Sequence, residues 1–74
     1  MTPIFKYDPE VDAAYLYLKQ PIVPGEVAQT VVSDAEIKMG AVNLDFDAAG
    51  HLLGIEILGA MQILGSEVLN ALRK

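Results

Sequence analysis

Residues 41–58 constrain the fold of this chain more than any other stretch. They read A-V-N-L-D-F-D-A-A-G-H-L-L-G-I-E-I-L. The apolar residues at 42, 44 and 46 alternate with polar ones, and those at 53, 55 and 57 continue the alternation after a turn. Alternation at period two is typical of half-buried strands. The stretch therefore predicts an antiparallel hairpin.

The length of the turn sets the register of this hairpin. A loop of residues 47–50 would place Leu44 opposite Leu53 and Val42 opposite Ile55. The large apolar side chains of both runs then share one face, whereas a shift of one residue would separate them. We therefore predict a four-residue loop of the kind most often built on a type I turn.

Two residues of the turn have predictable roles. Gly50 stands where the chain needs a positive φ to re-enter the sheet, a conformation that glycine adopts without a Cβ clash. Asp47 is expected to accept hydrogen bonds from the backbone of the turn, as aspartates in Asx turns do.

The rest of the chain predicts three further strands. They are expected at residues 4–7, 13–18 and 27–32, joined by a turn at 8–12, a loop at 19–26 and an exposed connection at 33–40. The second strand is apolar on both faces, with Ala14, Leu16 and Leu18 on one and Tyr15 and Tyr17 on the other. That pattern is typical of a central strand, or of a strand whose second face meets another surface.

The C-terminal residues predict a helix on one face of the sheet. Met61, Leu64, Val68 and Leu72 recur at helical spacing. Gly65 interrupts the pattern, and a helix capped by Ser66 is expected to follow it. The stripe should cover the face of Leu44, Phe46, Leu53, Ile55 and Ile57, leaving Ile63 and Leu69 beside it and Leu52 and Leu58 on the other face. The predicted fold is α+β: four to five antiparallel strands, in meander-like hairpins, and one C-terminal helix.

Composition limits the classes of function. Residues 1–74 make one small domain without cysteine, so no disulfide or thiolate metal site stabilises it. The formal net charge of −5 disfavours binding to nucleic acid. No run is long and apolar enough to span a bilayer and no signal peptide opens the chain, so we expect a cytoplasmic protein.

Two segments resemble a known family. They are Y-D-P-E-V-D-A-A-Y-L-Y-L at 7–18 and L-D-F-D-A-A-G-H-L-L-G-I-E-I-L at 44–58. The chain looks like the bacterial and archaeal DUF2283 proteins, also called YuzE-like, which have no established activity. Members often lie beside another small protein, and this resemblance implies a paired system of the toxin–antitoxin kind. Ala14 departs from the family, which usually carries a larger apolar residue there.

Several candidate sites can be weighed from residue spacing. Asp45, Asp47, Gly50 and Glu56 match four positions of an EF-hand loop, but the flanks read as strands. In the predicted register Glu56 lies roughly 13 Å from Asp45, at ~3.3 Å per residue. That separation argues against a shared cation and a glycosidase carboxylate pair. His51 is expected to be a solvated turn residue. We assign no catalytic, cofactor-binding or metal-binding residue.

The remaining candidate is an interaction patch on the sheet, made of Tyr15, Tyr17, Asn43, Asp45, Gly54 and Glu56. Gly54 marks either crowding beneath a tyrosine or the close approach of a partner. We expect a non-enzymatic interaction or self-association module, a dimer or the antitoxin-like partner of a small protein. The alternative is a protein that binds a small molecule or metal ion through the acidic part of the patch. An enzyme ranks third.

Overall fold

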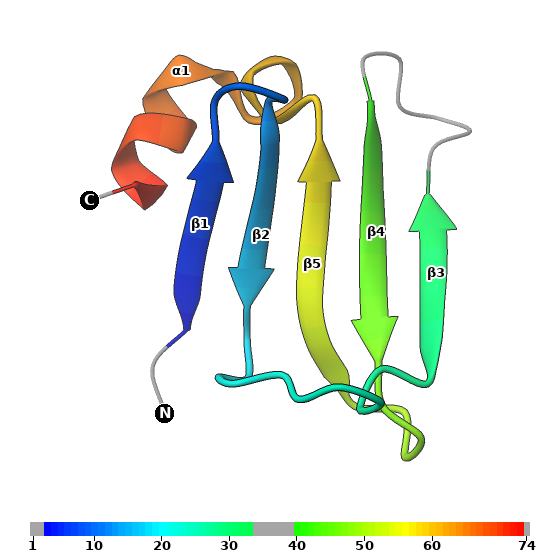
Figure 1. Ribbon diagram of the computed structural model, residues 1–74. Coiled ribbons are helices and arrows are strands. Elements are labelled where there is room, and N and C mark those ends of the chain that lie inside the picture. The colour runs from blue at the N-terminus through cyan, green and yellow to red at the C-terminus, as the bar shows by residue number, and fades with distance from the viewer. Residues whose placement is uncertain (1–2, 34–39, 74) are drawn as a thin grey trace.

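The structure, a computed structural model, describes residues 3–33 and 40–73. One sheet contains five strands, and a helix follows them: β1 (Ile4–Asp8), β2 (Ala13–Tyr17), β3 (Gln29–Ser33), β4 (Ala41–Phe46), β5 (Leu52–Leu58) and α1 (Ala60–Leu72). Figure 1 shows the spatial order β1-β2-β5-β4-β3, in which every neighbouring pair is antiparallel. The α+β prediction is confirmed. Of the predicted connection at 33–40, residues 34–39 lie outside the described residues.

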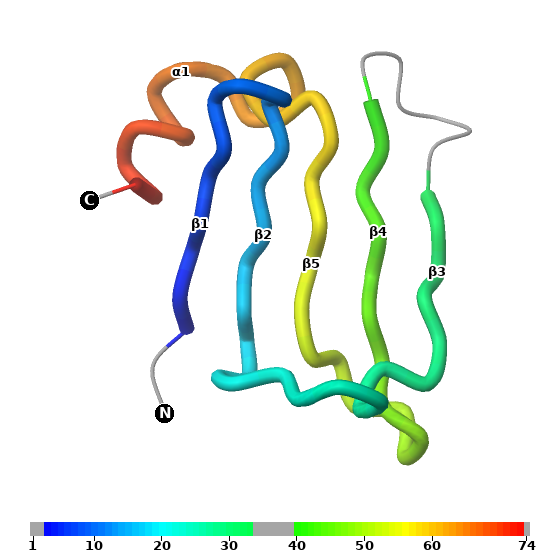
Figure 2. Tube along the Cα trace, in the orientation of Figure 1, coloured from blue at the N-terminus to red at the C-terminus, as the bar shows by residue number. Residues whose placement is uncertain are grey.

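The last strand in sequence runs through the middle of the sheet. Figure 2 shows the segment after β2 crossing below the ends of β5 and β4 to reach β3 at the far edge. The first residues of this segment are hydrogen-bonded to β5. The backbone carbonyl of Leu53 accepts hydrogen bonds from the N–H groups of Leu18 at 3.0 Å and Lys19 at 3.1 Å. As predicted, β2 is an interior strand, lying between β1 and β5.

The register predicted for the β4–β5 hairpin is wrong by two residues. Leu44 pairs with Ile55 and Val42 with Ile57, and an irregularity follows Asp45. The turn is one residue longer than predicted, and the bulge inserts a second residue on β5. Each change alone would invert the apolar face, but together they restore it. Leu52 pairs with Phe46 and so lies on the apolar face, not on the opposite one.

The turn itself has the predicted chemistry. Gly50 has a φ of 85°. One carboxylate oxygen of Asp47 accepts hydrogen bonds from the backbone N–H groups of Ala49 at 3.0 Å and His51 at 2.8 Å. Asp47 therefore forms the expected Asx turn.

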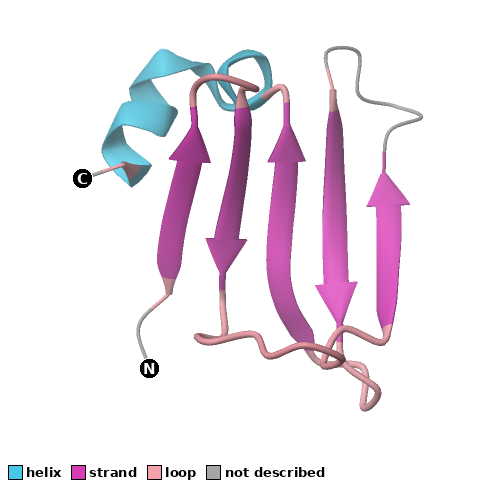
Figure 3. Ribbon diagram, viewed as in Figure 1, coloured by secondary structure: helices cyan, strands magenta, loops and turns pink. Residues whose placement is uncertain are grey.

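Helix α1 lies beside β1 at one end of the sheet, as Figure 3 shows, and its first residues pack on one sheet face. The core there consists of Ala14, Ile57 and Ala60, with partly buried Phe5, Tyr7, Ile55, Ile63 and Leu64 around it. These strand residues belong to β1, β2 and β5. Of the strand residues predicted to lie beneath the helix, Ile55 and Ile57 join this cluster. None of the helices in the described ranges is long and apolar enough to cross a membrane.

Of the predicted helix stripe only Leu64 packs on the core, and the other three positions are wrong. Ile63 packs on the core and Leu69 is fully buried, whereas Met61, Val68 and Leu72 are 39%, 48% and 41% exposed. Gly65 explains the difference, because its φ of 79° and ψ of 159° break the helix between its two halves. Residues on either side of the break therefore do not share one 3.6-residue period. The interruption was predicted; the Ser66 cap stays a prediction.

Asp12 fastens the start of α1 to the β1–β2 turn. Its carbonyl accepts hydrogen bonds from the N–H groups of Gly59 and Ala60, both at 3.0 Å. Its carboxylate accepts one from the N–H of Met61 at 2.9 Å and one from the hydroxyl of Tyr7 at 2.7 Å. Gly59, the residue before the helix, has no side chain to cap it, so Asp12 supplies the missing acceptors.

Candidate functional site

The six residues of the predicted patch lie together on one face of the sheet. In β2, β5 and β4 they form the cross-strand pairs Tyr15–Glu56, Tyr17–Gly54, Asn43–Glu56 and Asp45–Gly54. Their side chains alternate with those that pack against α1, so they face the opposite way. We call this surface the tyrosine face, defined by Tyr15, Tyr17, Asn43, Asp45, Gly54 and Glu56.

Tyr15 spans the centre of the tyrosine face. Its hydroxyl donates a hydrogen bond to one carboxylate oxygen of Asp45 at 2.6 Å, across the intervening strand. A Cβ atom at position 54 would lie 2.4 Å from the Tyr15 ring. Gly54 is therefore the residue that lets the ring cross β5, and the crowding interpretation of this glycine is confirmed.

The carboxylates of the face are held by neutral donors. The second oxygen of Asp45 accepts a hydrogen bond from the hydroxyl of Thr30, on β3, at 2.6 Å. Glu56 accepts one from the side-chain amide of Asn43 at 2.9 Å. The amide oxygen of Asn43 is buried without a hydrogen-bond partner among the described residues, an arrangement that normally costs free energy.

The two tyrosines form a ring pair at the β2 side of the face. Their centroids are 4.6 Å apart at an interplanar angle of 51°, within the range of favourable tilted aromatic pairs. Burial, followed by the hydrogen bond and the negative charge of Asp45, raises the pKa of Tyr15 well above its usual value of 10.0. Tyr15 therefore remains a neutral hydrogen-bond donor at physiological pH.

The distance estimated from sequence between the two carboxylates is wrong. Asp45 lies opposite Gly54, not Leu52, and Glu56 is only two residues further along β5. The two are diagonal neighbours, a relation with a typical separation of about 7–8 Å. The separation argument against a carboxylate pair or a shared cation therefore fails. No group of three acidic, histidine or cysteine residues within the described ranges could hold a metal ion.

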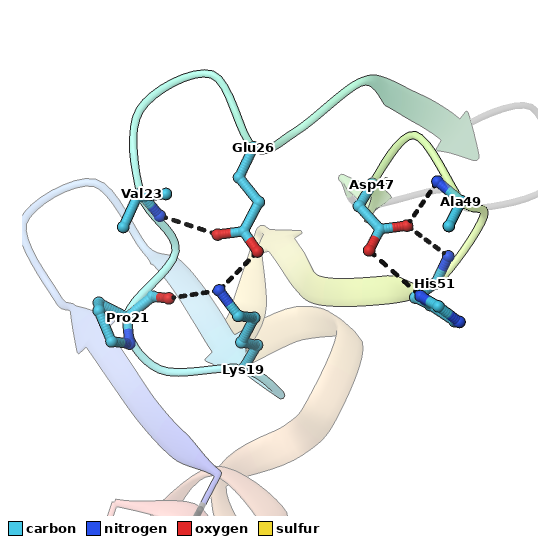
Figure 4. Close-up of polar contacts among 7 residues, drawn as sticks. All are labelled: Lys19, Pro21, Val23, Glu26, Asp47, Ala49 and His51. Carbon is cyan, nitrogen blue, oxygen red and sulfur yellow. Dashed lines mark hydrogen bonds and ion pairs between the residues drawn. The ribbon is translucent and has the colours of Figure 1, made fainter.

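A separate pair of polar clusters lies in the loops at the end of the sheet away from α1 (Figure 4). Lys19 contacts Glu26 at 2.5 Å, and Glu26 also accepts a hydrogen bond from the Val23 N–H at 3.0 Å. The bond from Lys19 is the main cause of a lowered Glu26 pKa. His51 is exposed as predicted and contacts Asp47 at 3.2 Å. The backbone N–H of His51 is the main cause of a lowered Asp47 pKa.

Three polar roles were missed from the sequence, those of Thr30, Asp12 and the Lys19–Glu26 pair. Thr30 and Asp45 meet because β3 pairs with β4, and period-two patterning does not determine which strands are neighbours. Asp12 precedes the start of α1 by 48 residues. Over so long a separation, the local sequence gives no indication that Asp12 caps the helix.

The fold and this face define a small α+β protein with one helix on one side of an antiparallel sheet and a hydrogen-bonded polar network on the other. The chain matches the family described as Protein of unknown function (DUF2283) over residues 4–60. It therefore belongs to that family, and the resemblance noted in the sequence is confirmed. Neither a curated protein nor a solved structure matches the chain.

Proposed function

We propose that this protein is a non-enzymatic protein-interaction module that associates with itself or with a second small protein, in the cytoplasm. The observation that carries the proposal is the position of α1. Its sheet contacts come from β1, β2 and β5, and no other helix or sheet in the described ranges lies on either face. Much of the sheet is therefore available as a binding surface.

The small buried core of the chain supports this proposal. Hydrophobic residues make up 53% of the sequence, yet among the described hydrophobic residues only Ala14, Leu53, Ile57, Ala60 and Leu69 are buried. A second chain would bury part of the exposed apolar surface.

Both faces offer apolar side chains for such a contact. On the helix side, Val42, Leu44 and Phe46 of β4 are only half-buried. On the tyrosine face, Val32 is 59% exposed and Leu58 is 38% exposed. Val32 and Leu58 flank a polar centre in which both carboxylates, Asp45 and Glu56, already accept hydrogen bonds.

Sedimentation equilibrium at micromolar concentration tests the proposal. We expect a mass above that of the monomer, or a monomer that binds an apolar dye until a co-purifying partner from the native host covers the surface. A monomer that neither binds the dye nor retains a partner contradicts the proposal. The product of the neighbouring gene is the first partner to test, because the family resemblance implies a paired system.

A second candidate function is the binding of a small molecule or metal ion at the tyrosine face. It is favoured by the diagonal placement of Asp45 and Glu56 and by the amide oxygen of Asn43, which has no hydrogen-bond partner in the described part of the chain. Isothermal titration with a panel of metal ions tests it, with Asp45→Asn and Glu56→Gln as variants that keep the side-chain shape. Heat of binding lost in both variants would favour this function over the interaction module.

A further inference from the structure

The outer edge of β3 differs from the other edge of the sheet. All five residues of β3 are exposed, with Val31 and Val32 at 40% and 59%. The strand reads Q-T-V-V-S and holds neither a charged residue nor a proline. Charges and prolines are the usual means by which proteins prevent an edge strand from pairing with another chain. The edge of β3 therefore lacks that protection.

The β1 edge is protected in the ways that β3 is not. It carries Lys6 and Asp8, and α1 lies beside it (Figure 1). The guanidinium of Arg73, just after the helix, lies over the ring of Tyr7 at 5.1 Å. One edge of the sheet is thus charged and flanked by the helix. The other, β3, is uncharged, and among the described residues no helix or strand lies beyond it.

The uncharged sequence of β3 lets this edge pair with a second copy of itself. Because the chain carries a formal net charge of −5, repulsion between two copies is smallest where no charged side chains face each other. The β3 edge is such a surface. The nearest carboxylate on the pairing strand, Asp45, is already hydrogen-bonded by Thr30 and Tyr15.

We propose that β3 pairs antiparallel with β3 of a second copy about a two-fold axis at Val31, forming a continuous ten-stranded sheet. In an antiparallel pair, residues opposite each other lie on the same face of the sheet. An axis between two residues would pair neighbours that lie on opposite faces, so the axis must pass through a residue. Centring on Val31 pairs all five residues: Val31 with its own copy, Gln29 with Ser33 and Thr30 with Val32. This inference rests on the proposed function and names its partner and surface.

Charge complementation at Val31 tests the pairing. Val31→Lys and Val31→Glu each place like charges opposite one another, which is destabilising. We expect the dimer dissociation constant to rise at least about ten-fold in each variant, and an equimolar mixture of the two to dimerise again. Val68→Lys, at a site on α1 that is 48% exposed, is the matched control and should dimerise like the parent chain.

A cysteine variant keeps the test decisive if a charge variant fails to fold. The chain has no cysteine, so Val31→Cys introduces a single thiol. Across the axis its Cβ atoms would lie about 4.5–5.5 Å apart, close to disulfide geometry. Oxidation should give a covalent dimer at least about ten-fold faster than Val68→Cys. Equal rates, with dimerisation unchanged in the charge variants, would overturn the β3 pairing while leaving self-association intact. A parent chain that stays monomeric up to millimolar concentration would overturn this pairing, and the proposed function would then depend on a hetero-partner.

Discussion

The ring of Tyr15 occupies the space that any side chain at position 54 would need. This relationship joins three strands, because Tyr15 starts on β2, crosses Gly54 on β5 and ends in a hydrogen bond to Asp45 on β4. A local sequence feature, one glycine in an apolar strand, thereby determines how the polar network of the tyrosine face assembles.

Gly54→Ala should destabilise the protein by about 1–3 kcal/mol, the usual cost of overpacking. The added methyl group displaces the Tyr15 ring and breaks its bond to Asp45. Urea unfolding measures the change. In a Tyr15→Ala background the same substitution should cost much less, because the clash is then absent. Equal costs in both backgrounds would show that the ring and the glycine are not coupled.

Stability at alkaline pH should depend on Tyr15. Because its folded-state pKa is raised above the ordinary value of 10.0, the group binds its proton more tightly in the folded protein. That contribution is fully present below pH 10 and is lost as the pH rises above it. Denaturant unfolding can be measured between about pH 8 and 11, a range that includes the ordinary tyrosine pKa. The free energy of unfolding should fall as the pH rises, and it should fall less steeply in Tyr15→Phe. Tyr17→Phe, from the same strand, is the control and should keep the decline.

Gly50→Ala should destabilise the protein by about 1 kcal/mol or more. A Cβ atom at this position meets no atom within 4 Å, so the cost reflects the φ of 85° alone. Gly50→Asn should cost less, since asparagine tolerates the left-handed region. Thermal or urea unfolding of the two variants provides the measurement, and an alanine variant as stable as the parent would refute the turn geometry.

Asp12→Ala should destabilise the protein by about 0.5–2 kcal/mol, the range measured for lost helix caps. The variant removes the acceptor for the Met61 N–H and the Tyr7 hydroxyl. It also places alanine at a φ of 52°. Asp12→Asn keeps an acceptor oxygen and tolerates that φ, so we expect it to stay within about 0.5 kcal/mol of the parent. If both variants unfold at the same denaturant concentration, the side chain does not cap α1.

The sequence by itself determined which side chains share a face within each regular strand, although not at Leu52 beside the bulge. Period-two alternation separates Tyr15 and Tyr17 from Ala14 and Leu16 however the strands are arranged. The positive φ of Gly50, the Asx turn at Asp47 and the break at Gly65 are equally local, because each depends on the conformational preferences of one or two residues.

Only the tertiary structure decided the pairings between elements. A shift of two residues leaves every side chain on its face, so alternation cannot distinguish Leu44 opposite Leu53 from Leu44 opposite Ile55. The bulge after Asp45 and the longer turn select the second register. The placement of β5 between β2 and β4 brings Tyr15, Gly54 and Asp45 into one line, and the break at Gly65 turns Leu69 inward and Val68 outward. The strand register and the strand order depend on contacts between residues far apart in the chain. The hydrophobic period of a single segment does not predict such contacts.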